Sequence, residues 1–254
     1  MPRFLLTIAY DGRPYGGWQV QPNAHSVQAD VEAAIESIYG KHVRIHGSGR
    51  TDTGVHADGQ CAHFDIAPPT RMSGDNWQRA INTKLPPGVR ILACREVADD
   101  FHSRFSAISK QYRYTLWLGK VLPPREAGWA WHFPQALDLD AIECAMPSFI
   151  GAHDFRYLCS RRGHEPDPLP DDYFVRKILD CHLEADGQAL HLHFHGSGFL
   201  YRMVRFMVAA MTEIGIARLS QEQLQNMLRG EDPWKHPRCA PPDGLRLMQV
   251  NYPD

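Results

Sequence analysis

The stretch Arg3-Phe4-Leu5-Leu6-Thr7-Ile8-Ala9-Tyr10 begins a series of elements that recurs later in the chain. It alternates and is rich in β-forming residues, which predicts a strand. A helix is expected from Ser26, a favourable N-cap, to Gly40, because Val27, Val31 and Ile35 fall on one helical face. Further predicted elements are strands at 42–46 and 60–66, a helix at 74–84 and a strand at 89–98. This order, β-α-β-β-α-β, is that of a split βαβ unit.

The second half of the chain shows a related order. Its predicted elements are a strand at 110–118, a helix at 138–150, strands at 173–185 and 188–195, helices at 198–216 and 220–229, and a strand at 245–252. Proline- and glycine-bearing stretches at 119–134 and 161–172 are predicted loops, the second of them acidic. We therefore expect an α+β fold with two ferredoxin-like subdomains, residues 1–106 and 107–254. If these units join through their sheets, a ligand cleft is expected at the junction.

Composition indicates a globular protein of the reducing cytoplasm. The 254 residues are 43% hydrophobic and 22% charged, which is close to globular averages. Six scattered cysteines include no CxxC pair, so neither a zinc site nor a disulfide framework is expected. No apolar run reaches membrane-spanning length, and the N-terminal run is too short for a signal peptide. We expect a cytoplasmic location without a membrane partner.

The net charge of −2 is unusual for a protein that binds nucleic acid, because neutralising phosphates drives such binding. Charge is unevenly distributed, however. Acidic residues cluster at 138–140, 165–172 and 231–232, while arginines and lysines gather elsewhere. The sequence is therefore compatible with a basic cleft on a nearly neutral body.

The stretch from Gly47 to Ala57 displays a single carboxylate, Asp52, on a glycine-rich turn. Glycines permit backbone conformations that other residues resist, and Arg50 lies two residues before the carboxylate. An aspartate in such a loop is often only a turn former or a helix cap. The alternative is a catalytic carboxylate, and the rest of the chain favours it.

Arg205 lies in a stretch that is apolar on almost every side, which predicts a buried helix. A guanidinium there is costly unless a carboxylate pairs with it. It is either an arginine that extends to solvent at the edge of the core or the partner of Asp52. Tyr112 and Tyr114 fall on one face of a predicted strand, where tyrosines are usually structural.

Three further patterns could indicate a metal site, a hydrolase or a dinucleotide-binding site, but none of them fits well. His191, His193 and His195 alternate with Leu190, Leu192 and Phe194, which places the imidazoles on the outer face of a sheet, and we expect no metal there. Neither Ser48 nor Ser197 completes a Gly-x-Ser-x-Gly hydrolase motif. The Gly47–Gly49 segment lacks the third glycine of a dinucleotide fingerprint.

Seven ordered blocks resemble the tRNA pseudouridine synthase A family. They are Asp11-Gly12 with Tyr15-Gly16-Gly17-Trp18-Gln19, Ser26-Val27-Gln28, Gly49-Arg50-Thr51-Asp52-Thr53-Gly54-Val55-His56, Asp100-Phe101-His102-Ser103-Arg104-Phe105-Ser106-Ala107, Lys110-Gln111-Tyr112-Arg113-Tyr114, Phe199-Leu200-Tyr201-Arg202-Met203-Val204-Arg205 and Pro242-Asp243-Gly244-Leu245. They extend over nearly the whole chain. The family pattern usually has Ala where this chain has Thr53.

This resemblance implies a cofactor-independent isomerase with two α/β subdomains, a continuous antiparallel sheet and a central cleft. Asp52 is then the catalytic residue, Arg205 its basic partner and Tyr112 the ring that stacks on uracil. Arg50 either helps to displace the target base or contacts a phosphate. The backbone from Leu245 to Leu247 resembles a segment that lines the uracil pocket. Whether Asp52 attacks as a nucleophile or abstracts a proton is left open.

The implied substrate is uridine at positions 38, 39 and 40 of the tRNA anticodon stem-loop, and the implied assembly is a homodimer. Basic residues expected to contact tRNA are Arg13, Lys41, Arg44, Arg104, Lys110, Arg113 and Arg161. Two rival hypotheses are a non-catalytic RNA-binding protein and a metal-dependent hydrolase that uses the histidine strand. If the protein only binds RNA, Asp52→Ala should leave its effect in vitro unchanged. A metal-dependent hydrolase should contain bound metal and should be inhibited by a chelator.

Overall fold

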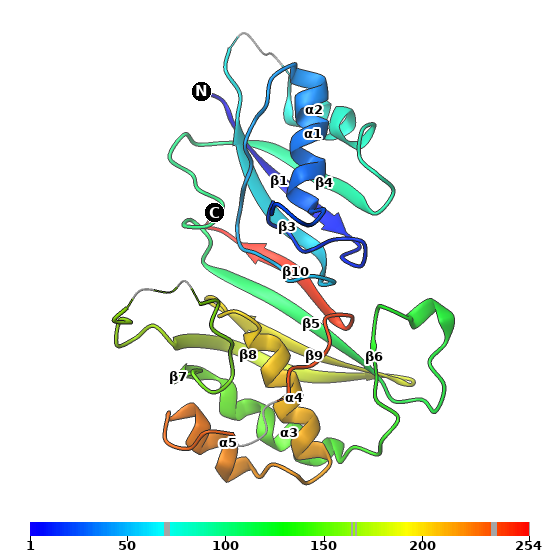
Figure 1. Cartoon of the computed structure of the whole chain (residues 1–254), viewed down its shortest axis with the longest axis vertical. Coiled ribbons are helices and arrows are strands. Elements are labelled where there is room, and N and C mark those ends of the chain that lie inside the picture. Colours follow the sequence, from blue (N-terminus) through cyan, green and yellow to red (C-terminus); the bar gives the residue numbers. More distant parts are fainter. Residues whose placement is uncertain (69–71, 164, 166, 235–237, 254) are drawn as a thin grey trace. The chain divides into compact units, whose positions relative to one another are not determined.

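The computed structural model of the chain describes residues 1–68, 72–163, 165, 167–234 and 238–253 (Figure 1). The chain forms two compact units, the first made of Met1–Ile108 with Arg246–Asp254 and the second of Ser109–Leu245. Each combines helices with a mostly antiparallel sheet, so the predicted α+β class is confirmed.

The first unit has the predicted element order. Its elements are β1 (Arg3–Tyr10), α1 (Val27–Tyr39), β2 (His46–Gly47), β3 (His56–Asp65), α2 (Gly74–Asn82), β4 (Val89–Val97) and, from the chain's end, β10 (Leu245–Asn251). Strand β1 lies between β4 and β3 and is antiparallel to both. Two strands pair with the other edge of β3. Strand β2 pairs with His63 and Ala62, and β10 pairs in parallel with His56 and Ala57. Without β10 this is the sheet order of a split βαβ unit.

Helix α1 begins and ends where the sequence predicts. The Ser26 side chain accepts a hydrogen bond from the Ala29 backbone N–H, and Gly40 ends the helix with a φ of 78°. Val27 and Ile35 are fully buried on its inner face. In α2, Trp77 is also buried and meets Phe64 of β3 edge to face, with 5.5 Å between ring centroids. These contacts form the core of the first unit.

Two strand boundaries in this unit were predicted wrongly. The expected strand at 42–46 is only His46–Gly47, although Val43 and Ile45 are buried. Side chains satisfy the backbone there instead of a neighbouring strand: Ile45 N–H donates to Glu32, and Gln28 donates to Ile45 C=O. Strand β3 starts at His56 rather than at 60, because β10 pairs with its first residues.

The second unit contains more irregular structure. Its elements are β5 (Ser109–Trp117), the 3₁₀ helix η1 (Pro124–Glu126), β6 (Trp131–His132), α3 (Leu139–Ala145), the 3₁₀ helix η2 (Met146–Phe149), β7 (Gly151–Asp154), β8 (Val175–Asp186), β9 (Ala189–Gly196), α4 (Met203–Gly215) and α5 (Gln221–Leu228). The sheet order is β5-β9-β8-β7, all antiparallel, and β6 adds a short parallel pairing to β5. Helices α3, α4 and α5 belong to this unit (Figure 1).

Several predictions for this unit need correction. The helix expected at 138–150 ends as α3 at Ala145 and continues as η2, because Pro147 cannot continue α-helical hydrogen bonding. Strands β6 and β7 were not predicted, and β6 lies inside the stretch 119–134 that was expected to be a loop. In the acidic loop 161–172, residues 164 and 166 lie outside the described part.

Helix α4 starts at Met203 rather than at 198. Arg202, just before it, has a φ of 61°, in the left-handed region, and no side chain caps the helix. Ten of the 13 residues of α4 are buried, which confirms the prediction of a buried helix. Arg205 is among the half-buried exceptions.

The compact units differ from the predicted subdomains 1–106 and 107–254 at the C-terminal strand. Residues from Arg246 belong with the first unit, because β10 pairs with β3 and the Arg246 guanidinium lies 3.0 Å from the Asp58 carboxylate. The continuous sheet and central cleft remain predictions. Among the described helices, none combines the length and the apolar character required to cross a membrane.

Candidate active site

Asp52 lies in the connection between β2 and β3, and both ends of this connection are fixed by hydrogen bonds. On the β2 side, the Ser48 backbone N–H donates to Cys61 C=O at 2.7 Å. The buried Gln60 accepts from the Ser48 hydroxyl at 2.8 Å and donates to Gly49 C=O at 3.1 Å. On the β3 side, Val55 N–H donates to Asp52 C=O at 3.1 Å and closes a tight turn. The sequence folds into a short, well-anchored loop around the carboxylate.

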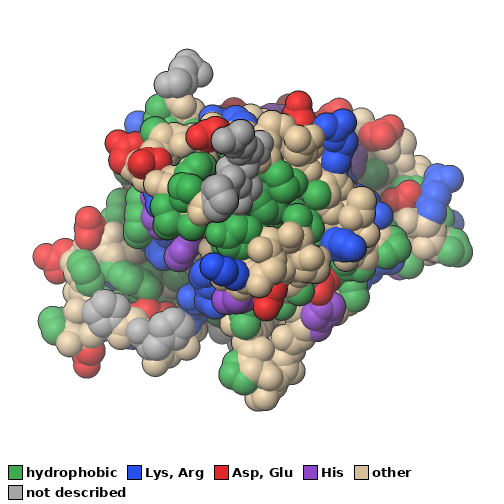
Figure 2. All heavy atoms as spheres, turned by 90° about the horizontal axis from the view of Figure 1, so that it is seen from above, with side chains coloured by type: hydrophobic (Ala, Val, Ile, Leu, Met, Phe, Trp, Pro, Cys, Tyr) green, Lys and Arg blue, Asp and Glu red, His purple; other side chains and the backbone are tan. Residues whose placement is uncertain are grey.

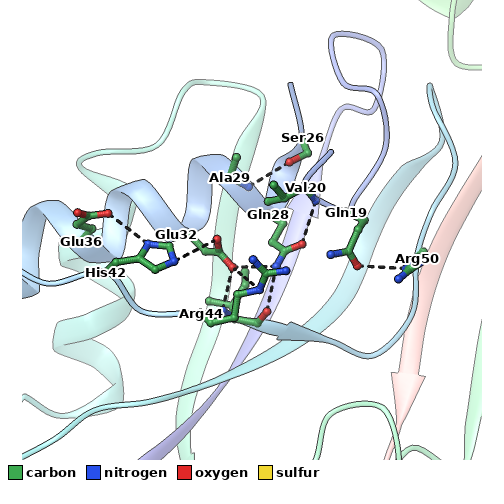
Figure 3. Close-up of polar contacts among 11 residues, drawn as sticks. Gln19, Val20, Ser26, Gln28, Ala29, Glu32, Glu36, His42, Arg44 and Arg50 are labelled. Atoms are coloured by element: carbon green, nitrogen blue, oxygen red, sulfur yellow. Dashed lines mark hydrogen bonds and ion pairs between the residues drawn. The ribbon is translucent and has the colours of Figure 1, made fainter. Parts of the chain in front are cut away.

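The segment Gly16–Val20 holds the loop from its other side. Trp18 N–H donates to Thr51 C=O at 3.2 Å, and the Thr53 hydroxyl donates to Gly16 C=O at 3.1 Å. Arg50 Nε donates to Gln19 Oε1 at 3.1 Å (Figure 3). These contacts reach the residues before and after Asp52. The half-buried carboxylate is therefore carried on a loop whose backbone is fixed.

Two glycines let the neighbouring backbones approach this closely. Gly17 has a φ of 105°, and a Cβ added there would lie 2.7 Å from Thr51 C=O. A Cβ on Gly12 would lie 2.1 Å from Val55 C=O. Real Cβ atoms do not come so near to a backbone oxygen, so either substitution must displace the loop. Asp11-Gly12 and Gly16-Gly17, which belong to the first block of the resemblance, thus have a direct structural role.

Buried polar side chains also contact the loop and the segment next to it. The Tyr10 hydroxyl is 2.7 Å from Thr51 Oγ1, and burial raises the pKa of this tyrosine to about 12. The phenol is therefore neutral at physiological pH. His56, almost completely buried, accepts the Gly12 N–H at 3.1 Å through Nδ1. Burial opposes ionisation of the nearby Asp11, but hydrogen bonds from Arg13 outweigh it and lower the pKa of that carboxyl.

The second unit carries the other two predicted catalytic residues. Arg205 lies on α4, where its Nε donates to Ala240 C=O at 2.6 Å. The half-buried ring of Tyr112, on β5, meets Phe199 edge to face at 5.1 Å. Tyr114 is fully buried and donates its hydroxyl to Pro241 C=O, which agrees with the structural role predicted for it. Asp52 and these residues lie in different compact units, so their convergence stays a prediction.

The predicted uracil-pocket residues flank the boundary between the units along β10. Leu245 is buried in the second unit, where its N–H donates to Pro242 C=O at 2.8 Å. Leu247 is buried in the first unit and pairs with Ala57, close to the end of the Asp52 loop. The structure therefore brings Leu247 near the Asp52 loop within one unit.

The predicted RNA-contact residues are spread over both units. Arg13, Lys41, Arg44 and Arg104 are exposed in the first, and the half-buried Lys110 and Arg113 and the exposed Arg161 lie in the second. On the face in Figure 2, lysines and arginines are interspersed with acidic and apolar side chains.

The three histidines of β9 are half-buried and face away from the buried Leu190, Leu192 and Phe194, as predicted. Each contacts a different neighbour: His191 contacts Thr115, His193 lies 3.3 Å from Glu184 Oε2, and His195 contacts Ser109. Within the described ranges, no three potential ligands are grouped in a way that could hold a metal.

Sequence reasoning missed the residues that support the loop. Gln19 and Gln28 fell within quoted blocks without a role, and Tyr10 and Glu32 were not singled out. Their contacts join segments that are far apart in the sequence, so no local pattern could reveal them. The one hint in the sequence was that Gln19 and Gln28 each directly follow an apolar residue, Trp18 and Val27.

A family model described as tRNA pseudouridine synthase matches residues 6–106 and 145–253. The tRNA pseudouridine synthase A of Akkermansia muciniphila is 45% identical, with 100% of this chain and 96% of that protein covered. Proteins named tRNA pseudouridine synthase A 1 in Desulfotalea psychrophila and tRNA pseudouridine synthase A in Listeria monocytogenes are each 38% identical, covering 99% of this chain and 100% of each relative.

The chain belongs to the tRNA pseudouridine synthase family, and its similarity over the full length is to the synthases named A. It is accordingly an isomerase. The resemblance noted from the seven sequence blocks is confirmed.

Proposed function

We propose that this chain isomerises uridine to pseudouridine at positions 38, 39 and 40 of the tRNA anticodon stem-loop, with Asp52 as the catalytic carboxylate. The reaction breaks the N1–C1′ bond, turns the uracil and forms a C5–C1′ bond, and C5 loses a proton while N1 gains one. Substrate and product have the same atoms, so neither a redox partner nor a cofactor is required. Family membership supports tRNA uridine as the substrate.

The observation that carries this proposal is the anchoring of the Asp52 loop. Hydrogen bonds reach residues 49, 50, 51 and 53, and glycines at 12 and 17 allow close backbone packing. A catalytic group must be held in a defined geometry, and supporting hydrogen bonds supply it. A simple turn former needs none of this support. Asp52 then acts by nucleophilic attack or by proton abstraction.

The remaining residues complete the proposed site. Arg205 pairs with Asp52 and favours its charged form, because an opposite charge lowers a carboxylate pKa. Tyr112 stacks on the uracil, and the backbone from Leu245 to Leu247 lines the pocket. Arg50 helps to displace the target uridine, with unstacking offset by the contacts of the inserted side chain. The subdomain 1–106 thus supplies the carboxylate, and 107–254 supplies its partners.

We further propose that the enzyme acts in the cytoplasm as a homodimer on which tRNA contacts both subunits. Arg13, Lys41, Arg44, Arg104, Lys110, Arg113 and Arg161 are the proposed tRNA contacts. Phosphate contacts of this kind make binding weaken as salt concentration rises. Their modest number suits a protein with a net charge of −2.

Tritium release from tRNA labelled at uridine C5 tests the proposal, since conversion transfers that hydrogen to solvent. The assay compares the native chain with Asp52→Asn, without any added cofactor. Asp99→Asn is the matched control, because this carboxylate is 80% exposed and its ion-pair partner is the N-terminal amine, 3.7 Å away. We expect release by the native chain and by the control, and none by Asp52→Asn.

Equal release by Asp52→Asn would place the chemistry on another residue. Binding of tRNA without release by the native chain would support the non-catalytic RNA-binding alternative. No tritium release, together with bound metal and a hydrolytic activity that a chelator inhibits, would instead support the metal-dependent hydrolase.

A further inference from the structure

Arg50 donates a hydrogen bond to a neutral side chain from a different segment, Gln19. Its Nε lies 3.1 Å from Gln19 Oε1, and both side chains reach the molecular surface, with Arg50 exposed and Gln19 half-buried (Figure 3). A guanidinium at the end of a long side chain has several rotamers, and a hydrogen bond from its Nε fixes the plane of the group. The Gln19 amide therefore restricts where the Arg50 guanidinium points.

Gln19 is itself on a fixed segment. The Trp18 N–H donates to Thr51 C=O, and the Gln28 backbone N–H donates to Trp18 C=O at 3.0 Å. On the other side of Gln19, Val20 N–H donates to Gln28 Oε1 at 3.0 Å. Gln28 thus holds the residue before Gln19 with its backbone and the residue after it with its side chain.

The Gln28 side chain is oriented by a buried carboxylate. Its Nε2 donates to Glu32 Oε1 at 2.8 Å and to Ile45 C=O at 3.2 Å, which leaves Oε1 directed at Val20 (Figure 3). Glu32 also accepts the Ile45 N–H at 3.0 Å and lies 3.6 Å from Arg44 Nε. Gln28 and Glu32 are 2% and 5% exposed. Polar groups this buried are costly when unsatisfied, so the network resists a change that breaks any of these hydrogen bonds.

We propose that Gln19 is a positioning residue that holds the Arg50 guanidinium ready for displacement of the target uridine, and that the buried Gln28–Glu32 pair fixes Gln19 for this purpose. The proposal rests on the proposed function and on the role given there to Arg50. It also gives the Ser26-Val27-Gln28 block a functional reason besides capping α1. Gln19 acts through Arg50 and does not itself contact the reacting atoms.

The test measures kcat and KM for pseudouridine formation with Gln19→Leu, which removes the acceptor but keeps the size of the side chain. Gln21→Leu is the matched control. Gln21 lies on the same segment and also makes a hydrogen bond, at 2.6 Å to Gly16 C=O, but it is not bonded to Arg50. We expect kcat to fall about five- to tenfold for Gln19→Leu, which corresponds to the net contribution of one typical hydrogen bond. KM for tRNA and the Gln21→Leu kcat should stay within about twofold, since neither change removes a binding contact.

A double-mutant cycle with Arg50→Ala identifies the path of the effect. If Gln19 works through Arg50, Gln19→Leu has no further effect on kcat once Arg50 is alanine. Additive losses would overturn the proposal, as would an unchanged kcat in Gln19→Leu or a change in KM alone. Gln19→Glu retains an acceptor oxygen and should keep kcat within about threefold of native. If Gln19→Leu reduces the yield of folded protein, Gln19→Glu is measured in its place. A large loss of kcat in Gln19→Glu would contradict the proposal.

The proposal and the proposed function fail in different ways. An active native chain that Asp52→Asn inactivates and Gln19→Leu leaves unchanged would overturn only the role of Gln19. A native chain without isomerase activity would overturn both.

Discussion

The Asp52 loop and helix α4 carry the two charged residues of the proposed chemistry, and they are held in opposite ways. The loop is fixed by hydrogen bonds to Gly16–Val20, Gln60 and Tyr10, with glycines where backbones meet. Helix α4 has no capping side chain at its start, and ten of its 13 residues are buried. Polar contacts therefore fix the loop that carries the carboxylate, while apolar packing holds the helix that carries the arginine.

This difference predicts a separation of effects. Hydrogen bonds are directional, so the loss of one next to Asp52 should alter geometry and rate more than global stability. Burial of apolar side chains is nondirectional and contributes broadly to the free energy of folding. Changes in α4 should therefore reduce stability first, and changes around the loop should reduce activity first.

The largest effect on stability is expected for Met207→Ala in α4. Met207 is fully buried, and such a truncation costs about 2–5 kcal/mol of unfolding free energy. Denaturant unfolding measures this, and kcat per folded molecule should stay within about threefold of native. Glu213→Ala, at a half-buried position of the same helix, should cost less than about 0.5 kcal/mol. Native stability with a large loss of kcat in Met207→Ala would break the comparison.

Gly17→Ala should affect both properties, because Gly17 combines a positive φ with contact to the loop. Gly40→Ala is the matched control: its φ is 78°, but nothing lies within 4 Å of the added Cβ. Each substitution should cost about 1–2 kcal/mol for the left-handed backbone. Only Gly17→Ala should also lower kcat, by about tenfold or more, since Thr51 must move. Equal activity in the two variants would show that loop position does not limit the rate.

Tyr10→Phe should cost about 1 kcal/mol, because it removes one buried hydrogen bond to Thr51. The unfolded phenol ionises near pH 10, and the folded pKa is raised to about 12 by burial. This contribution is therefore intact below about pH 10 and is lost as the pH rises through about 12. Unfolding free energies of the native chain and Tyr10→Phe between pH 8 and about pH 12 should converge with rising pH. A difference that stays constant over this range would contradict the assignment.

Thr53→Ala should have the smallest effect. Its hydroxyl donates to Gly16 C=O at 3.1 Å, but the residue is exposed, and water can replace this bond. We expect less than about 0.5 kcal/mol in stability and less than about twofold in kcat. A loss of kcat as large as that of Gly17→Ala would show that the exposed hydrogen bond positions Asp52 and would sharpen the account accordingly.

Local signals in the sequence predicted much of the first unit. Ser26 and Gly40 marked both ends of α1, since a cap and a left-handed C-terminal glycine leave a clear pattern. The strand expected at 42–46 failed because Glu32 and Gln28 satisfy the backbone of Ile45, which no alternation reveals. In the second unit, Arg202 has a left-handed backbone conformation, so α4 begins after it and later than predicted. Helix propensity does not predict such a conformation within an apolar stretch.

The candidate site was likewise predictable only in part. The glycines around Asp52 identified the loop, and the apolar surroundings of Arg205 identified a buried helix. Gln19, Gln28 and Glu32 escaped notice because their roles depend on contacts between separate segments. Side chains that support a site from a distance in sequence become visible only once the fold brings them together.

Mapping of pseudouridine at single-nucleotide resolution in tRNA tests the central claim most directly. Native protein, Asp52→Asn and Gly40→Ala would be incubated with unmodified tRNA, and positions 38, 39 and 40 compared. The account predicts pseudouridine at these positions with the native chain and with Gly40→Ala, and none with Asp52→Asn. Modification by Asp52→Asn at the native rate, or by the native chain only outside the anticodon stem-loop, would contradict it.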